Sequence, residues 1–183
     1  MSEPAREASR RRRKLFEYGG VVASIVLIVF GIGTIVAGAV GIDKVRDDLA
    51  REKIVGTPDS EIPGQLVDTG DEARKFADVM RKHTLEITGG KTYAEMPRFL
   101  DEQGNPTNDE AAAAKDPETG KPVENQARQI WVTETALTTA LNMAFFAESV
   151  GMFAIVMGIA LLLTGIGFLV VTAYALRRPG PAA

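Results

Sequence analysis

Residues 18–42 read YGGVVASIVLIVFGIGTIVAGAVGI, and residues 149–176 read SVGMFAIVMGIALLLTGIGFLVVTAYAL. Neither stretch contains Asp, Glu, Lys or Arg, although these residues make up 25% of the whole chain. A bilayer with about 30 Å of hydrocarbon is crossed by roughly 20 helical residues, so each stretch is long enough to span it. The sequence therefore predicts two transmembrane helices, at 18–42 and 149–176.

Charged residues beside the two stretches predict their orientation. The flanking tails, residues 1–17 and 177–183, hold 8 basic and 3 acidic residues, and the connecting segment 43–148 holds 13 basic and 21 acidic residues. Basic residues beside a span are retained in the cytoplasm. We therefore expect a multi-pass protein of the plasma membrane with both termini cytoplasmic and residues 43–148 outside. The basic tail, expected to be disordered, is the part that would contact anionic lipid.

A cleavable signal peptide is the alternative interpretation of the first stretch. A basic segment, an apolar core and Ala37-Gly38-Ala39 together resemble such a signal. The uncharged stretch exceeds the usual core of about 7 to 15 residues, which favours a retained anchor.

Small residues recur along both predicted spans. In the first span they lie at Ser24, Gly31 and Gly38, and a second series comprises Gly33, Ala37 and Gly41; in the second span they lie at Gly151, Gly158, Gly165 and Thr172. Small side chains on one face allow helix backbones to approach closely in lipid. The pattern favours packing of the two spans against each other, and contact between copies of the chain or no role at all are the alternatives.

The segment between the spans has helical patterning, so the predicted fold class is all-α. We expect the first helix to continue through 43–55, a loop at 56–70, an amphipathic helix at 71–87, and a long helix from Val123 into the second span. Residues 101–122 are polar and rich in Pro, Gly and Ala, which predicts a flexible insertion. Trp131 is expected to cover a small core with the helix at 71–87.

The residue inventory leaves little room for catalysis. The chain has one histidine and no cysteine, so a single copy cannot assemble the ligand sets of catalytic zinc or non-haem iron. A Gly-x-Ser-x-Gly elbow is also missing. We therefore predict no enzyme activity, no metal site and no cofactor. His83 is interpreted as a residue facing the small core, with a pH-sensing or ligand-binding role as the alternative.

The turn after the helix at 71–87 is the most specific local motif. Gly89-Gly90 is a helix stop, and Thr92 with Glu95 fits a capping box that opens another turn of helix. Thr88 to Thr92 superficially resembles a phosphate loop, but it lacks the Gly-x-x-x-x-Gly-Lys spacing and a preceding strand.

Residues 83–96, HTLEITGGKTYAEM, resemble a set of small actinobacterial two-span membrane proteins often labelled aromatic ring-opening dioxygenase LigA. The resemblance extends to residues 49–55 and 142–153, and residues 101–122 look like an insertion relative to shorter relatives. It implies the two-span topology. The iron ligands of a dioxygenase are missing here, so the resemblance carries over no catalytic residue.

These observations predict a non-enzymatic interaction or accessory protein of the cell envelope. Its expected partners are the lipid bilayer and another membrane or envelope protein, without nucleic acid. A homo-oligomeric pore or transport component is the alternative. The candidate interaction motif comprises His83, Thr88, Gly89, Gly90, Lys91, Thr92, Tyr93 and Glu95.

Overall fold

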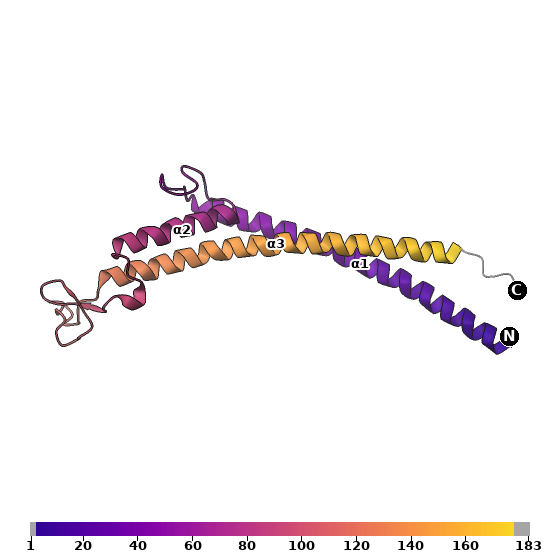
Figure 1. Ribbon diagram of the computed structural model, residues 1–183, viewed down its shortest axis with the longest axis horizontal. Helices are drawn as coiled ribbons and strands as arrows, with labels where there is room; N and C mark the ends of the chain where they lie inside the picture. Colours follow the sequence, from indigo (N-terminus) through magenta and orange to yellow (C-terminus); the bar gives the residue numbers. More distant parts are fainter. Residues whose placement is uncertain (1–2, 178–183) are drawn as a thin grey trace. The chain divides into compact units, whose positions relative to one another are not determined.

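The computed structural model describes residues 3–177, and it describes the side chains of Arg11 and of residues 18–176. The chain is mostly helical (Figure 1). Its helices are α1 (Glu3–Glu52), α2 (Gly70–Ile87) and α3 (Gln126–Arg177), with a 3-10 turn η1 (Tyr93–Glu95). Two short strands, β1 (Phe99–Leu100) and β2 (Pro106–Thr107), pair antiparallel.

Helix α1 begins at Glu3, so the basic segment before the first span is helical where disorder was expected. The reason is compositional. Apart from Pro4, which lies in the first turn where proline is tolerated, the segment consists mainly of Ala, Arg, Glu, Lys and Leu, which favour helix. Residues 178–183 lie outside the described part of the chain, and with them the flanking Arg178.

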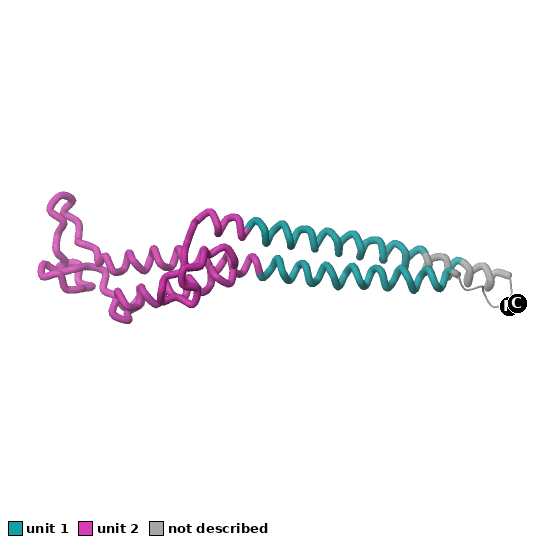
Figure 2. The backbone as a smooth tube through the Cα atoms, turned by 90° about the horizontal axis from the view of Figure 1, so that it is seen from above, with its two compact units in different colours: residues 1–44, 149–183 teal, residues 45–148 magenta. Residues whose placement is uncertain are grey.

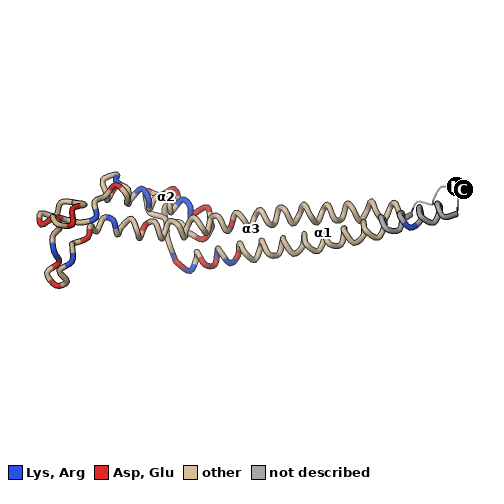
Figure 3. Tube along the Cα trace, turned by 90° about the horizontal axis from the view of Figure 1, so that it is seen from below, with Lys and Arg blue, Asp and Glu red and all other residues tan. Residues whose placement is uncertain are grey.

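The chain divides into two compact units, residues 1–44 with 149–183, and residues 45–148 (Figure 2). Unit 1 contains both uncharged stretches, whereas most of the charged residues coloured along the trace in Figure 3 belong to unit 2. Two stretches of helix, Tyr18–Glu52 and Gln126–Leu176, are long and apolar enough to cross a membrane.

In unit 1 the predicted stripes of small residues bring α1 and α3 together. A Cβ built at Gly31 would lie 2.8 Å from the Gly158 carbonyl oxygen, and one at Gly38 would lie 2.6 Å from that of Gly151. Gly165 faces Ile28 in the same way. Later residues of α1 contact earlier residues of α3, so the two helices run in opposite directions over this stretch. Packing within the chain is therefore confirmed as a use of these glycines.

The second series of small residues is not part of that contact. Nothing lies within 4 Å of a Cβ built at Gly33 or Gly41, and Ala37 is exposed. The spacing of seven therefore identifies the packed face, because a repeat of 3.5 residues per turn keeps one stripe against a partner helix.

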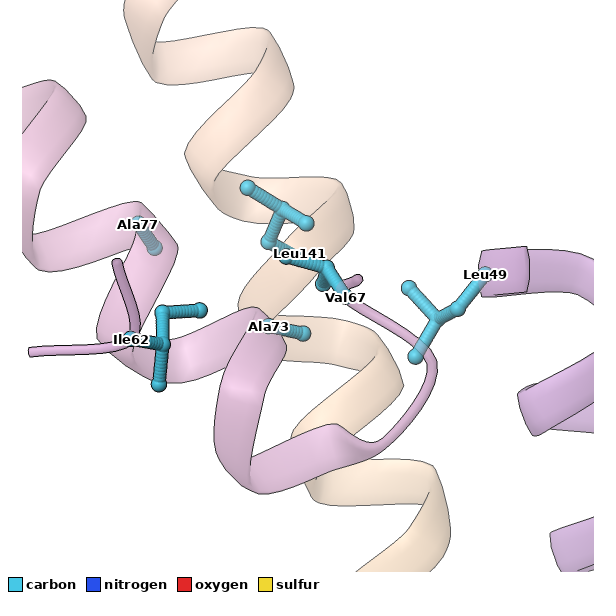
Figure 4. Close-up of a cluster of buried hydrophobic side chains, with 6 residues drawn as sticks. All are labelled: Leu49, Ile62, Val67, Ala73, Ala77 and Leu141. Atoms are coloured by element: carbon cyan, nitrogen blue, oxygen red, sulfur yellow. The ribbon is translucent and has the colours of Figure 1, made fainter. Parts of the chain in front are cut away.

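Unit 2 has a small hydrophobic core to which α1, the loop after it, α2 and α3 contribute. Leu49 of α1, Leu141 of α3 and residues of the intervening loop and α2 form a buried cluster, whose remaining members are Ile62, Val67, Ala73 and Ala77 (Figure 4). The loop 53–69 folds back on itself, since the Val67 amide donates to the Ile54 carbonyl at 2.8 Å.

Helix α2 starts one residue before the predicted position. Its N-cap is Thr69, and the Glu72 carboxylate accepts hydrogen bonds from the Thr69 amide and hydroxyl at 2.9 Å each. The pattern Thr-x-x-Glu was visible in the sequence as a capping box.

Residues 101–122 do not support the expected flexible insertion. Bridges join Asp101 to Ala113 and Lys115 to Pro122, and the Ala114 amide donates to the Leu100 carbonyl at 2.9 Å. The segment is a compact set of hydrogen-bonded turns beside the two short strands.

Candidate interaction site

The stop at the end of α2 positions the candidate motif. The Gly90 amide donates to the Leu85 carbonyl at 2.7 Å, and the Gly89 amide donates to the Glu86 carbonyl at 3.3 Å. This pair of bonds is a Schellman motif, which needs a left-handed residue after the C-cap. Gly89 supplies it with φ of 63°. The predicted helix stop is confirmed, and a helix rather than a strand precedes Thr88.

Trp131 fixes the turn against α3. Its indole nitrogen donates to the Lys91 carbonyl at 2.9 Å, and its side chain is 3% exposed. The Thr88 hydroxyl lies 2.7 Å from the same carbonyl oxygen. Arg81 of α2 stacks 5.2 Å from the centre of the Trp131 ring. Trp131 is therefore buried beside α2, but it is not a member of the hydrophobic core cluster that it was expected to cover.

Beyond this anchor, the motif presents an exposed aromatic ring. Tyr93 is 45% exposed, and the Arg128 guanidinium lies 4.1 Å from its ring centre. The Glu95 carboxylate accepts from the Thr92 amide at 2.8 Å and from its hydroxyl at 2.7 Å. These bonds hold the pKa of Glu95 below its ordinary value and fix the turn that carries Tyr93.

A hollow of about 230 Å³ adjoins Tyr93. Aromatic, cationic, amide and carboxylate side chains line it: Tyr93 and Phe99, Arg98 and Arg128, Asn125 and Gln129, and Glu124. The Asn125 amide group donates to the Pro97 carbonyl at 2.9 Å, which ties the start of α3 to the segment after η1.

His83 does not belong to this site, and it does not face the small core as expected. Its Nε2 lies 2.8 Å from a carboxylate oxygen of Asp59, which also accepts from Lys82 at 3.1 Å. His83 and Thr88 are five positions apart in the sequence, so they lie about 140° apart around the helix axis. The core interpretation was wrong because the partner of His83 lies 24 residues earlier, in a loop without periodic patterning.

Glu148 is a structural residue that sequence reasoning missed. One of its carboxylate oxygens accepts from the Gly70 amide at the start of α2, and the other accepts from the Arg46 guanidinium of α1. Its side chain is 15% exposed. A carboxylate at a helix N-terminus is favoured by the exposed amides and the helix dipole. One side chain of α3 therefore joins α1 and α2 within unit 2.

Glu134 of α3 is buried without full hydrogen bonding. It is 4% exposed, and its Oε1 has no hydrogen-bond partner in the described part of the chain. Its Oε2 accepts from the Thr135 hydroxyl at 3.3 Å. Leaving a buried acceptor without a hydrogen bond costs about 1–3 kcal/mol of folding free energy. Packing alone therefore does not explain why a glutamate occupies position 134.

The described residues hold no group of three or more His, Asp or Glu side chains placed to bind a metal ion. Comparison with known proteins found no matching family model, curated protein or solved structure.

Proposed function

We propose that the chain is a two-span integral membrane protein whose segment 43–148 docks another protein of the cell envelope. The observation that carries the membrane part is the exposure of large apolar side chains along both spans. Phe30, Phe153 and Val171 are each about two-thirds exposed (66%, 65% and 66%). Monomeric soluble proteins rarely expose continuous apolar surfaces of this extent, whereas lipid solvates them.

The polar groups within the spans fit the same environment. The hydroxyls of Ser24, Thr34 and Thr164 each donate to the carbonyl four residues earlier, at 2.7 Å. Such bonding satisfies the hydroxyl inside the helix, which hydrocarbon requires because it offers no hydrogen-bond partner. The basic residues at 10–14 and at 177–178 favour cytoplasmic termini.

The turn at residues 88–95 is the proposed docking site. Tyr93 is exposed on a turn already fixed by the Schellman motif, the Trp131 indole and the Thr92–Glu95 bonds. A rigid surface loses little conformational entropy on binding, and tyrosine and arginine are enriched among residues that dominate binding energy. The hollow beside Tyr93 would receive a side chain of the partner.

Site-specific photocrosslinking tests this assignment. A benzoylphenylalanine is placed at Tyr93, and in a second variant at Glu118, an exposed position among the turns at 101–122. In cells that normally make the protein, the expected result is one discrete envelope protein captured from position 93 and not from position 118. Equal capture at both positions would contradict docking at the turn.

A homo-oligomeric pore is the second candidate. Gly33, Ala37 and Gly41 leave one face of α1 open to a further copy. A pore built from several copies would need small residues facing its lumen, whereas Gly31, Gly38 and Gly158 lie between the two spans of one chain. Copy number in mild detergent separates the candidates, since a monomer or dimer cannot enclose a pathway with two spans per chain.

A further inference from the structure

A groove runs between α2 and the first half of α3, within unit 2. This groove is open to solvent on one side and has a volume of about 490 Å³. Its apolar lining residues are Met80, Ile130 and Leu137, and its polar ones are Thr84, Gln126, Gln129, Thr133 and Glu134. Small-molecule sites in proteins typically enclose 300–1,000 Å³, with mostly apolar walls and a few placed polar groups. The volume of this groove lies in that range, and its wall combines three apolar side chains with two glutamines, two threonines and Glu134.

Glu134 provides the charge of the groove. Its Oε1 is the one buried side-chain nitrogen or oxygen without a hydrogen-bond partner among the residues the structure describes. Arg81 of α2 stacks on the Trp131 ring. The last torsion of a glutamate side chain is broad and roughly two-fold, so Oε1 turns toward the groove at little cost.

We propose that this groove binds a small organic monocation, an ammonium or guanidinium group joined to a short apolar body. The cation would pair with Glu134, and the body would lie against Met80, Ile130 and Leu137. An anion is repelled by the carboxylate. A divalent metal requires several oxygen ligands, and the groove supplies one carboxylate. The proposal does not rest on the docking site at Tyr93, although Gln129 lines both the groove and the hollow beside Tyr93.

The full chain in lipid nanodiscs is titrated with 4-fluorobenzylammonium and followed by fluorine NMR, with empty nanodiscs subtracted. Saturable binding is expected, weakened at least tenfold in Glu134→Gln. The matched control is Glu86→Gln, which removes an exposed carboxylate of α2 and leaves binding unchanged. The neutral analogue 4-fluorobenzyl alcohol should bind weakly and equally to all three proteins. Absence of saturable binding, or equal binding to parent and Glu134→Gln, would overturn the proposal.

A second variant guards against a folding defect in Glu134→Gln. Thr133→Arg places a guanidinium in the groove from an exposed position of α3. It should abolish binding while the helical circular dichroism stays that of the parent, and unchanged binding would contradict the site. Blocked lysine, Nα-acetyl-lysine methylamide, carries the same ammonium on a peptide backbone. We expect blocked lysine to bind more weakly than 4-fluorobenzylammonium. If it binds more tightly, the groove takes a lysine side chain of a protein, and the small-molecule assignment is overturned.

Discussion

At the scale of single residues, Glu148 joins two helices outside the hydrophobic core. Its two oxygens bond the start of α2 and the guanidinium of Arg46. Glu148→Gln keeps the shape and removes the charge. Because hydrogen bonds to charged groups contribute about 1.5–3 kcal/mol, we expect unit 2 to lose a similar amount of unfolding free energy. Hydrogen exchange of the first turn of α2 measures it.

The control for Glu148→Gln is Asp71→Asn. Asp71 pairs with Lys75 on the exposed surface of α2, and exposed pairs contribute about 0–1 kcal/mol. Equal changes in exchange for the two variants would show that Glu148 does not join the helices.

Asp59 gives stability a dependence on pH. Hydrogen bonds from His83, Thr57 and Lys82 hold the pKa of Asp59 well below its usual range. The folded state therefore favours the carboxylate, and the resulting stability is fully present above the ordinary aspartate pKa of about 4. It is lost as the pH falls further.

The corresponding variant is Asp59→Asn. We expect it to melt at a lower temperature than the parent at pH 6, and we expect the gap to close as the pH falls below about 4. Thermal unfolding by circular dichroism at several pH values measures the gap. Asp78→Asn, an exposed substitution on α2, is the control. A gap that stays constant down to pH 3 would rule out this role for Asp59.

Local motifs made some site residues predictable and long-range contacts made others unpredictable. Gly89, Glu95 and Trp131 follow from helix stops, capping boxes and helical spacing within a few residues. The pairs His83–Asp59 and Glu148–Gly70 join residues 24 and 78 positions apart. No periodicity in the sequence points from one partner to the other, so only the folded chain reveals them.

At the scale of elements, the two stripes of α1 make a matched pair of substitutions possible. A Cβ at Gly31 would lie 2.7 Å from the Leu162 backbone nitrogen, whereas one at Gly33 meets nothing within 4 Å. Gly31→Ala must separate the helices, and overpacking of this kind costs about 1–3 kcal/mol. Gly33→Ala should be neutral or stabilising by up to about 1 kcal/mol, because alanine favours helix.

Unfolding of the helix pair in mixed micelles of rising sodium dodecyl sulfate compares these variants. Equal destabilisation by Gly31→Ala and Gly33→Ala would mean that the spacing of seven does not identify the packed face.

Helices whose apolar residues recur at a regular spacing were predictable from the sequence. Strands and turns held by backbone hydrogen bonds were not. The helix expected at 71–87 is Gly70–Ile87, because its apolar positions recur at intervals of three and four. The strands at 99–100 and 106–107 and the turns at 101–122 depend on backbone bonds such as Asp116 to Lys121. A polar sequence without periodicity carries little trace of such bonds.

At the scale of the whole molecule, the chain combines a helical unit that contains both uncharged stretches with a unit that holds most of the charged residues. The division at 44/45 and 148/149 falls close to the ends of the uncharged windows. A bilayer favours the apolar surface of unit 1. An aqueous compartment favours unit 2, in which acidic residues outnumber basic ones. Our central proposal, which rests on the basic residues flanking the spans, is that residues 43–148 lie outside and both ends lie inside.

The absence of cysteine from the sequence allows a direct test of that topology. Three single substitutions, Ser9→Cys, Glu118→Cys and Pro181→Cys, are exposed in intact cells to a maleimide that does not cross membranes. We predict that only Glu118→Cys is labelled, and that the other two are labelled once the cells are permeabilised. Labelling of Ser9→Cys or Pro181→Cys in intact cells, or protection of Glu118→Cys, would contradict the two-span topology.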